Sequence, residues 1–543
     1  MKYFSTRGGD QKLSFEETVL AGLAPNGGLY IPETIPSLPA DWRTKWSSYS
    51  FIDLSVAILS LYISSEEISH DELRSLVEKS YKTFRHPEVT PLKKLNDKMF
   101  VLELFHGPTF AFKDVALQLL GNLFEFFLLR RNAKKAAGEK PEKLTVVGAT
   151  SGDTGSAAIY GLRNKANISI FILHPKGRVS PIQEAQMTTV TDANVHNVAV
   201  KGTFDDCQDI VKTLFADREF NSTHRLGAVN SINWARILAQ TVYYFLSFFQ
   251  IQSQLPVGTN IDDIVIQYVV PTGNFGDILA GYYAKKMGLP MGKLAVATNA
   301  NDILARFWKN GKYEKVDSTP VEAAGPTAPV DGSSDGKQAT DASGVKETLS
   351  PAMDILISSN FERLLWYLAY ETVSGTTDEK HTAACKTLDG WMSKMKNDGR
   401  VEVPVSALEA AHKDFVAERI SDQVTLETIR SFFDGEPSYV ADPHTAVGLA
   451  AARIIAPQNS LNVRQIVLST AHPAKFSEAV SRALEGSSHF NFERDVLPEE
   501  FHGLLQKEKR VIEVERPEVD LVKAVIEEVA GRDEAKVATA GSV

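Results

Sequence analysis

The sequence predicts an α/β protein whose core contains parallel strands. From about residue 100 onward, short apolar stretches alternate with amphipathic helical patterns, which is typical of parallel strands joined by crossover helices. In such sheets, ligands bind beyond the carboxyl ends of the strands. We therefore expect function to reside in the turns that follow the predicted strands, which are Met99–Leu104, Leu144–Val147, Ile168–Leu173, Ile264–Val270 and Ile466–Ser469.

Residues 1–95 are predicted to form a largely helical N-terminal region. Ser14 followed by Glu16 and Glu17 is typical of a helix start, because serine caps the free N–H groups and acids favour the positive end of the helix. A short strand is expected at Leu29–Pro32. Two amphipathic helices follow, marked by Leu54, Ile58, Leu61 and Tyr62 and by Leu73, Leu76, Val77 and Tyr81.

The first turn of interest places Lys113 at the start of a helix. A Gly-Pro turn leads through Phe110-Ala111-Phe112 into Lys113 and then into a long apolar helical pattern. Apolar surroundings disfavour an ammonium and lower the pKa of a lysine, and a partly neutral lysine can act as a Schiff-base nucleophile. The alternative is that Lys113 only begins the helix and stays solvated, and this stretch alone does not separate the two interpretations.

Three of the predicted strands end in turns rich in small polar residues, at 148–155, 272–277 and 469–475. The turn Gly273–Gly276 suits a phosphate, because glycine allows the backbone to approach an anion and the N–H groups of the following helix point at it. It contains no Lys or Arg, so backbone amides and the helix end would bind the phosphate. A tight strand-to-helix turn that needs glycine would have the same sequence.

The turn at 148–155 is not a standard nucleotide motif. It lacks the Gly-Lys-Ser/Thr ending of a P-loop and the GxGxxG spacing of a dinucleotide fold. Its hydroxyls and amides at Thr150, Ser151 and Thr154 could hold a carboxylate. A capped helix N-terminus is the alternative interpretation.

Three histidines, His106, His444 and His472, stand in motif-like turns. No pair of them has metal-ligand spacing such as HExxH, so we expect no metal site. His472 precedes a proline and its alternative role is to shape its turn. Asp442 before Pro443 is likewise typical of a capped helix start.

Composition narrows the classes of function. The 543 residues, 43% of them hydrophobic and 23% charged, predict a globular protein of two or three domains. A net charge of −10 argues against binding to nucleic acid or to an anionic membrane surface. The apolar stretches at 117–129 and 238–251 are short for a membrane span and are interrupted by polar residues, so we expect buried helices.

The remaining features predict a reducing, cytoplasmic location. Only two cysteines, Cys207 and Cys385, are present and they form no CxxC pair. The first residues show no apolar signal-peptide segment. Residues 315–350 are rich in small polar residues and are predicted to be a mobile insert, and the tail after about residue 528 is predicted to fray.

Taken together, the motifs resemble those of the threonine synthases of the longer fungal type, within the fold type II pyridoxal-phosphate enzymes, which are tryptophan synthase beta-like. The resemblance covers nearly the whole chain apart from the 315–350 insert and the tail. It is carried by HGPTFAFKD at 106–114, GATSGDTGSAA at 148–158, SPIQEAQM at 180–187, NSINWARI at 230–237, VPTGNFGD at 270–277, DPHTAVG at 442–448 and STAHPAKF at 469–476.

The resemblance implies a fold and a set of site residues. The expected organisation is the helical region 1–95, a lobe at 96–257 with the cofactor lysine and substrate-carboxylate loop, and a lobe at 258–543 with the cofactor phosphate loop. Lys113 would hold pyridoxal 5'-phosphate, and Thr445 would face its pyridine nitrogen. The phosphate loop would comprise Gly273, Asn274, Phe275, Gly276 and Asp277. The substrate would be bound by Ser151, Gly152, Asp153 and Thr154 through its carboxylate, with Arg178 a candidate for its phosphate.

The implied reaction is the conversion of O-phospho-L-homoserine and water to L-threonine and phosphate. The substrate amine displaces Lys113, whose freed amine moves the α and then a β proton; the γ-phosphate leaves and water adds at the β carbon. Because misplaced water would divert the reaction to 2-oxobutyrate, we expect one lobe to close over the substrate.

Two alternatives stay open at this point. One is a phospholyase that makes 2-oxobutyrate from the same substrate, and the other is a non-catalytic binding protein that has kept the fold. The site residues do not separate the first alternative from the synthase. The expected assembly is a monomer or a homodimer.

Overall fold

The computed structural model describes residues 1–315 and 344–540, with the backbone alone for 533–540. Most of the predicted mobile insert at 315–350 therefore lies outside the described residues. Its last residues, 344–350, are described: Thr348 Oγ1 donates to Asp354 Oδ1 over 2.6 Å.

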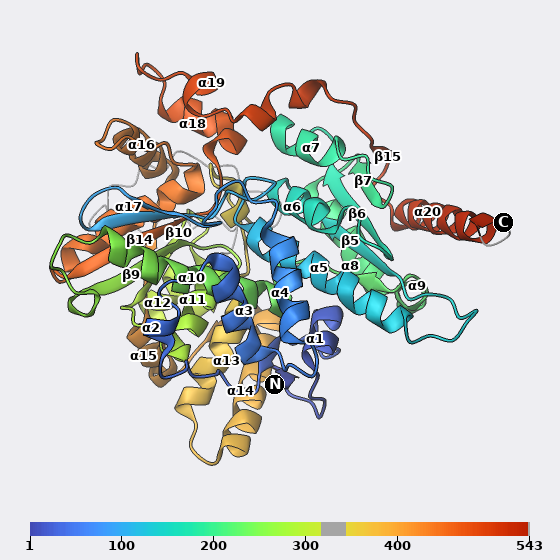
Figure 1. The fold of residues 1–543 in the computed structure, drawn as a ribbon, viewed down its shortest axis with the longest axis horizontal. Helices are drawn as coiled ribbons and strands as arrows, with labels where there is room; N and C mark the ends of the chain where they lie inside the picture. Colours follow the sequence, from blue (N-terminus) through green and yellow to red (C-terminus); the bar gives the residue numbers. More distant parts are fainter. Residues whose placement is uncertain (316–343, 541–543) are drawn as a thin grey trace, which may run out of the picture. The chain divides into compact units, whose positions relative to one another are not determined.

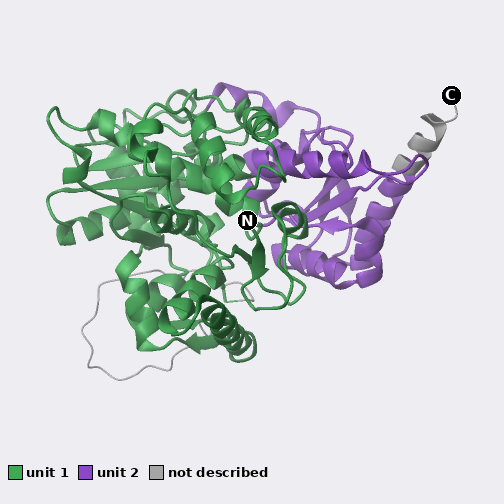
Figure 2. Cartoon of the chain, turned by 60° about the horizontal axis from the view of Figure 1, so that its bottom comes forward, with its two compact units in different colours: residues 1–116, 231–497 green, residues 117–230, 498–543 purple. Residues whose placement is uncertain are grey.

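Contacts divide the chain into two units, each assembled from segments that are distant in the sequence (Figure 2). Unit 1 comprises Met1–Ala116 and Ser231–Leu497, and unit 2 comprises Leu117–Asn230 and Pro498–Val543. These bounds differ from the lobe boundaries expected from the sequence. The reason is that the strand before Lys113 shares a sheet with the strand before the glycine turn at 273–276.

The main sheet of unit 1 has the strand order β13-β10-β9-β14-β4-β3. Three of these strands, β9, β10 and β14, are labelled in Figure 1. Its strands are parallel except for β3, which runs antiparallel to β4. The register places Ile466 of β14 opposite Phe100 of β4 and Tyr268 of β9. The strands are β3 (Leu92–Lys94), β4 (Met99–Glu103), β9 (Val265–Pro271), β10 (Leu294–Thr298), β13 (Phe415–Arg419) and β14 (Val463–Ser469).

This topology positions the site. Because β4, β14 and β9 are neighbours and parallel, their carboxyl ends meet at one edge of the sheet. The Lys113 turn follows β4, the glycine turn follows β9, and the 469–475 turn follows β14. Three turns that are far apart in the sequence therefore converge.

Helices cover this sheet and extend unit 1. Helices α10, α11, α12 and α17 pack on its strands. The helices of the unit are α1 (Phe15–Ala21), α2 (Trp42–Lys45), α3 (Phe51–Tyr62), α4 (His70–Tyr81), α10 (Trp234–Gln254), α11 (Gly276–Met287), α12 (Ile303–Asn310), α13 (Phe361–Thr372), α14 (Thr377–Asp398), α15 (Val405–Asp414), α16 (Asp422–Phe433), α17 (Pro443–Ile455), α18 (Ser477–Ala483) and α19 (Phe492–Asp495). Small antiparallel sheets pair β1 (Tyr3–Ser5) with β2 (Tyr30–Pro32) and β11 (Lys312–Glu314) with β12 (Arg400–Glu402).

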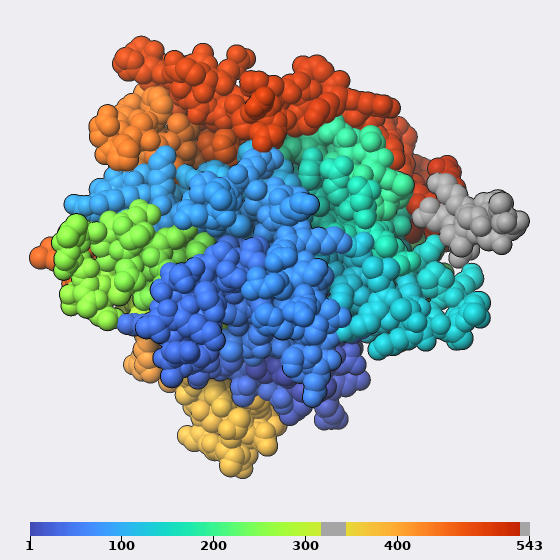
Figure 3. Space-filling view, in the orientation of Figure 1, coloured from blue at the N-terminus to red at the C-terminus, as the bar shows by residue number. Residues whose placement is uncertain are grey.

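The N-terminal region is helical, as its pattern predicts. Helices α1, α3 and α4 each begin with a capping box, formed by Ser14, Ser50 and Ser69 with an acid three residues later. These reciprocal hydrogen bonds satisfy N–H groups that a helix start otherwise leaves unpaired. The region forms much of the face of unit 1 seen in Figure 3, where it is blue.

Unit 2 contains a parallel sheet with the order β15-β7-β6-β5-β8. Its strands are β5 (Leu144–Ala149), β6 (Ile168–Pro175), β7 (Val195–Val200), β8 (Leu226–Gly227) and β15 (Ile512–Val514). Its helices are α6 (Asp153–Leu162), α7 (Pro181–Thr188), α8 (Phe204–Ala216), α9 (Arg218–His224) and α20 (Val519–Ala540). The turn at 148–155 joins β5 to α6, at the carboxyl end of its strand.

The C-terminal segment of unit 2 is more ordered than predicted. Strand β15 pairs with β7, and Val514, Val522 and Ile526 are buried in the same core as Val198 and Ile210. Helix α20 continues through Ala540. The prediction that the tail frays after about residue 528 was therefore wrong for the backbone as far as Ala540. The Glu, Ala, Lys and Arg residues of this stretch are all good helix formers.

Helix α5 (Lys113–Asn132) begins in unit 1 and ends in unit 2. Together with α10 it contains the apolar stretches that the sequence predicted to be buried helices, and Leu119 and Leu123 of α5 are 1% exposed. None of the described helices combines the length and apolar character that a membrane crossing demands.

Candidate functional site

Lys113 is a buried lysine at the first position of α5. Its residue is 9% exposed, and its Nζ lies 5.8 Å from the centre of the Phe112 ring. The turn before it is bonded to the segment after β14: Phe112 N–H donates to the Thr470 carbonyl over 2.8 Å, and His472 N–H donates to the Phe110 carbonyl over 3.0 Å. A solvated lysine that merely begins a helix does not fit this burial.

Close packing inside the turn explains its glycine. A Cβ at Gly107 would lie 2.4 Å from the Cβ of Asp114, which is closer than side chains approach. Phe110 adopts a left-handed backbone with φ of 60°, and the Arg85 guanidinium lies 3.7 Å from the centre of its ring. These contacts restrict the conformation of the backbone that leads into Lys113.

The glycine turn after β9 leaves the start of α11 open to an anion. A Cβ at Gly273 would lie 3.0 Å from the Ala352 carbonyl oxygen, and Phe275 has a left-handed φ of 64° with its ring buried. No side chain caps the first turn of α11. Its N–H groups and the positive end of the helix can therefore bind a phosphate.

Asp277, the last residue of this predicted loop, directs its carboxylate to two tyrosines of α10. Tyr243 and Tyr244 donate to Asp277 Oδ1 over 2.5 and 3.1 Å. Burial raises the pKa of this carboxyl to about 7, and no described group hydrogen-bonds to Oδ2. What Asp277 offers to an anion in the turn is its backbone N–H.

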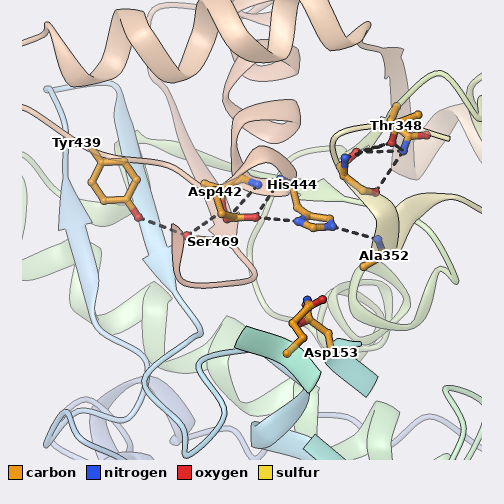
Figure 4. Close-up of polar contacts among 11 residues, drawn as sticks. Asp153, Thr348, Ala352, Tyr439, Asp442, His444 and Ser469 are labelled. Carbon is orange, nitrogen blue, oxygen red and sulfur yellow. Dashed lines mark hydrogen bonds and ion pairs between the residues drawn. The ribbon is translucent and has the colours of Figure 1, made fainter. Parts of the chain in front are cut away.

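Thr445 belongs to a buried hydroxyl network at the end of β14. Its hydroxyl donates to the Asp442 carboxylate and lies 2.9 Å from Ser469 Oγ. Tyr439 donates to Ser469 over 3.3 Å (Figure 4). Asp442 also accepts from the N–H groups of His444 and Thr445, so the predicted helix cap at Asp442 is confirmed.

His444 connects this network to the glycine turn. Its Nδ1 lies 2.8 Å from Asp442 Oδ1, and its Nε2 accepts from the Ala352 N–H over 3.1 Å (Figure 4). The acceptor role of Nε2 assigns the ring proton to Nδ1, which leaves the imidazole neutral. The carbonyl of the same Ala352 borders Gly273, so one helix start positions both Thr445 and the turn.

Arg236 is a buried cation that sequence reasoning missed. It is 4% exposed, and no described group hydrogen-bonds to its Nε or Nη1. Burial lowers its pKa from 12.5 to about 10. A guanidinium in this state needs an anion, because an unpaired buried charge is strongly disfavoured.

Arg363 lies in the same unit and is equally buried, but its guanidinium has hydrogen-bond acceptors, as expected of a structural arginine. Its three nitrogens donate to the carbonyls of Tyr30 and Ile232 and to Asn360 Oδ1, over 2.5–3.0 Å. Arg236 has no such set among the described residues.

The first turn of α10 places Arg236 near the glycine turn. Its sequence neighbour Ile237 and its helix-face neighbour Gln240 lie 3.4 and 3.8 Å from a Cβ built on Gly276. The sequence signal that could have identified Arg236 is an arginine inside the apolar pattern of the NSINWARI motif. The sequence could not show that its Nε and Nη1 have no hydrogen-bond acceptor within the part of the chain that the structure describes.

The 151–154 loop lies in unit 2, after β5. Thr150 Oγ1 accepts from the N–H groups of Gly152 and Gly155 over 3.0 and 2.8 Å, and Asp153 Oδ1 accepts from Gln183 over 2.8 Å. Gly152 has a φ of 150°, and α6 begins at Asp153 with no side-chain cap. The first amides of α6 can therefore bind a carboxylate, while Ser151 is exposed.

Arg178, the other predicted substrate residue, is exposed in the turn between β6 and α7 of unit 2. The structure thus gathers Lys113, the 273–277 turn and Thr445 at one edge of the unit 1 sheet. It assigns Ser151, Gly152, Asp153, Thr154 and Arg178 to unit 2.

The other two histidines singled out in the sequence, His106 and His472, have local partners. His106 Nε2 lies 2.9 Å from Glu103, and His472 Nδ1 accepts from the Ala474 N–H over 3.2 Å, so His472 shapes its turn. Within 1–315 and 344–532, no group of three or more His, Cys, Asp or Glu side chains is arranged to hold a metal ion.

Comparison with known proteins identifies the family. The description "Threonine synthase N terminus" matches residues 2–81, "Pyridoxal-phosphate dependent enzyme" matches 83–353, and "Threonine synthase, C-terminal" matches 445–526. Over 98% of its length the chain is 54% identical to the threonine synthase of Schizosaccharomyces pombe, covering 99% of that protein. The chain belongs to the threonine synthase family.

Further relatives agree with this assignment. The threonine synthase of Saccharomyces cerevisiae is 54% identical, with 97% of each chain covered. The crystal structure of threonine synthase from yeast superposes with a TM-score of 0.88 at 52% identity, covering 98% of this chain and 99% of that one. A PLP-bound threonine synthase from Brucella melitensis superposes with a TM-score of 0.82 at 39% identity, covering 97% and 99%.

Membership of the threonine synthase family confirms the predicted enzyme class, fold and cofactor. The protein is a pyridoxal-phosphate-dependent lyase of fold type II. The residues present fit that cofactor: a turn where a Cβ at Gly273 would clash, an uncapped helix start and a buried lysine lie at one sheet edge.

Proposed function

We propose that this protein is a threonine synthase that converts O-phospho-L-homoserine and water into L-threonine and phosphate. The observation that carries the proposal is that a buried lysine, Lys113, and a glycine turn leading into an uncapped helix both lie at the carboxyl edge of the unit 1 sheet. The family relationship supports the choice of substrate.

Lys113 would hold the cofactor and then transfer protons. Bound pyridoxal phosphate supplies an electron sink for charge that develops next to the substrate amine. Once released from the cofactor, the Lys113 amine would take the proton from the substrate α carbon, pass that proton on, and as a free amine again take one from the β carbon. Its buried position beside Phe112 keeps water from competing for these protons.

The turn 273–277 would bind the cofactor phosphate through backbone N–H groups and the start of α11. Thr445, held by Asp442, would face the pyridine nitrogen. A hydroxyl there, unlike a carboxylate, leaves that nitrogen largely unprotonated and makes the ring a milder electron sink.

The substrate carries two anionic groups, and the proposal assigns each to a site. The amides of Ser151–Thr154 would hold its carboxylate. Arg236 would bind its phosphate, because the glycine turn already serves the cofactor phosphate and Arg236 has an uncompensated charge. The same charge would stabilise the phosphate as it leaves. Arg178, a residue of unit 2, is a second candidate.

Product analysis tests the proposal. The purified protein, loaded with pyridoxal phosphate, is incubated with O-phospho-L-homoserine, and threonine, 2-oxobutyrate and phosphate are quantified. Equal amounts of threonine and phosphate support a synthase, whereas 2-oxobutyrate as the main product would make the protein a phospholyase. Absence of both a visible cofactor band and turnover would make it a non-catalytic binding protein. Lys113→Ala is the control and should lose the band and all turnover.

We further propose that the enzyme works in the cytoplasm as a monomer or homodimer and binds no nucleic acid. The net charge of −10 and the presence of only two cysteines, both buried, support this proposal. Light scattering on the eluting protein measures the oligomeric state, and cell fractionation measures the location. A higher oligomer, or recovery with an organelle, would contradict the corresponding part.

A further inference from the structure

Two buried, oppositely charged side chains meet at Thr109, inside the turn that leads to Lys113. Lys475 is 2% exposed, and its Nζ donates to the Thr109 carbonyl oxygen over 2.8 Å. Asp114 is fully buried and accepts from the Thr109 N–H and hydroxyl over 2.7 and 2.8 Å. The two residues are 361 positions apart in the sequence (475 − 114).

Each of these buried charges stabilises the other. A carboxylate or an ammonium in the interior is costly alone, and an opposite charge nearby reduces that cost. The pKa of Asp114 shows both effects: burial raises it to about 6, while the Thr109 hydrogen bonds and the Lys475 charge act to lower it.

The pair is placed to act on Lys113. Asp114 is the next residue in α5, and Lys475 lies in the short helix η4 (Pro473–Phe476). That helix follows the segment whose backbone bonds to Phe110 and Phe112. Asp114 therefore contacts the Lys113 turn from α5, and Lys475 contacts it from the segment that follows β14.

We propose that Lys475 and Asp114 are positioning residues for Lys113, forming a buried charge pair through Thr109 that holds the turn and balances the charge beside the Lys113 amine. This inference rests on the proposed role of Lys113 as the residue that carries the cofactor. It assigns a function to the STAHPAKF motif, which the proposed reaction did not otherwise use.

The other charged or titratable residues on the segments packed against this turn are not substituted in the test. His106, Glu103, Asp442 and Arg85 act on the pKa of His472, which burial lowers to about 4. None of them is changed in the variants below, so differences between variants report the pair itself.

The test is a spectroscopic titration of the loaded enzyme. The visible absorbance of the cofactor follows the proton equilibrium of the Lys113–cofactor linkage as pH is raised. We expect Lys475→Gln, which removes a positive charge, to move the midpoint upward by roughly half a pH unit or more. Asp114→Asn should move it downward by a similar amount, and the double variant should return it close to the parent value.

Opposite shifts that cancel in the double variant are an electrostatic signature that loosened packing would not produce. The matched control is Lys94→Gln, which breaks the exposed Lys94–Asp97 ion pair (2.7 Å) of the same unit and should leave the midpoint unchanged. Urea unfolding of the same proteins should show Lys475→Gln less stable than the double variant, because the single variant keeps the buried Asp114 carboxylate without the Lys475 charge.

The outcomes separate this inference from the proposed function. If the parent enzyme binds the cofactor and its midpoint is the same in all variants, the charge-pair inference is wrong while the role of Lys113 stands. Shifts of the same sign in both single variants would also overturn it. If the parent lacks a cofactor band that depends on Lys113, the proposed function itself fails.

Discussion

Replacing Arg236 by methionine should make the enzyme more stable and nearly inactive. Burial lowers the pKa of this guanidinium from 12.5 to about 10. At about 1.4 kcal/mol for each pKa unit, the interior disfavours its charge by about 3 kcal/mol. Methionine has a similar length and fills irregular space without a charge. The Arg236→Met variant should therefore gain about 1–3 kcal/mol of unfolding free energy in phosphate-free buffer.

Activity should change in the opposite direction. An arginine that binds a phosphate forms charge-assisted hydrogen bonds worth about 1.5–3 kcal/mol each. Loss of two such bonds lowers kcat/KM for O-phospho-L-homoserine by about 10²- to 10⁴-fold. Inorganic phosphate should raise the melting temperature of the parent enzyme and leave that of Arg236→Met unchanged.

The assays are urea unfolding, steady-state kinetics and thermal melting with and without phosphate. Arg363→Met is the matched control: it removes a buried arginine that has three hydrogen-bond acceptors, so it should destabilise the protein by about 3 kcal/mol or more. If Arg236→Met is destabilised in the same way and keeps its kcat/KM, the assignment of an anion to Arg236 is refuted.

Two further predictions concern the glycine turn and the carboxylate behind it. Gly273→Ala places a Cβ 3.0 Å from the Ala352 carbonyl oxygen and should weaken pyridoxal-phosphate affinity by about tenfold in an absorbance titration. Gly390→Ala, in the helix α14 with open space around it, should leave that affinity unchanged, and equal weakening by both would reject the steric argument. Burial raises the pKa of Asp277 from its ordinary value near 4 to about 7, so the folded state binds the proton more tightly. Its contribution to stability is therefore present at low pH and is lost as pH rises from about 4 to about 7, by about 4 kcal/mol. Urea unfolding across this range should show that loss in the parent relative to Asp277→Asn, and parallel pH profiles would contradict it.

Short sequence patterns, in which the interacting residues are close together in the chain, predicted much of the fold and about half of the site. Serine followed by an acid three residues later predicts a helix start because both partners lie in one turn of chain. The glycine turn at 273–276 and the Asp442 cap are equally local. Strands β4, β9 and β14 were predictable because their apolar stretches are bounded by turn residues.

Other features depend on partners that are distant in the sequence. Strands β7, β10 and β15 were not predicted, because a short strand is stabilised by its neighbours in the sheet more than by its own residues. Arg236 looks ordinary in the sequence, and only tertiary packing shows that its guanidinium is enclosed with no acceptor for Nε or Nη1 among the described residues. The Lys475–Asp114 pair bridges two turns that only the strand order brings together.

The discontinuity of unit 2 has a consequence for synthesis on the ribosome. The segment Leu117–Asn230 is made first, whereas β15 and α20 belong to Pro498–Val543, which emerges after the 267 residues of Ser231–Leu497 (497 − 230). At about 5–20 residues per second, translation delivers them roughly 13–50 s later. During that interval the outer edge of β7 has no partner strand and offers its backbone to any neighbouring chain. Shielding of this edge, or slow folding of the segment around it, would protect the nascent chain until β15 has been made.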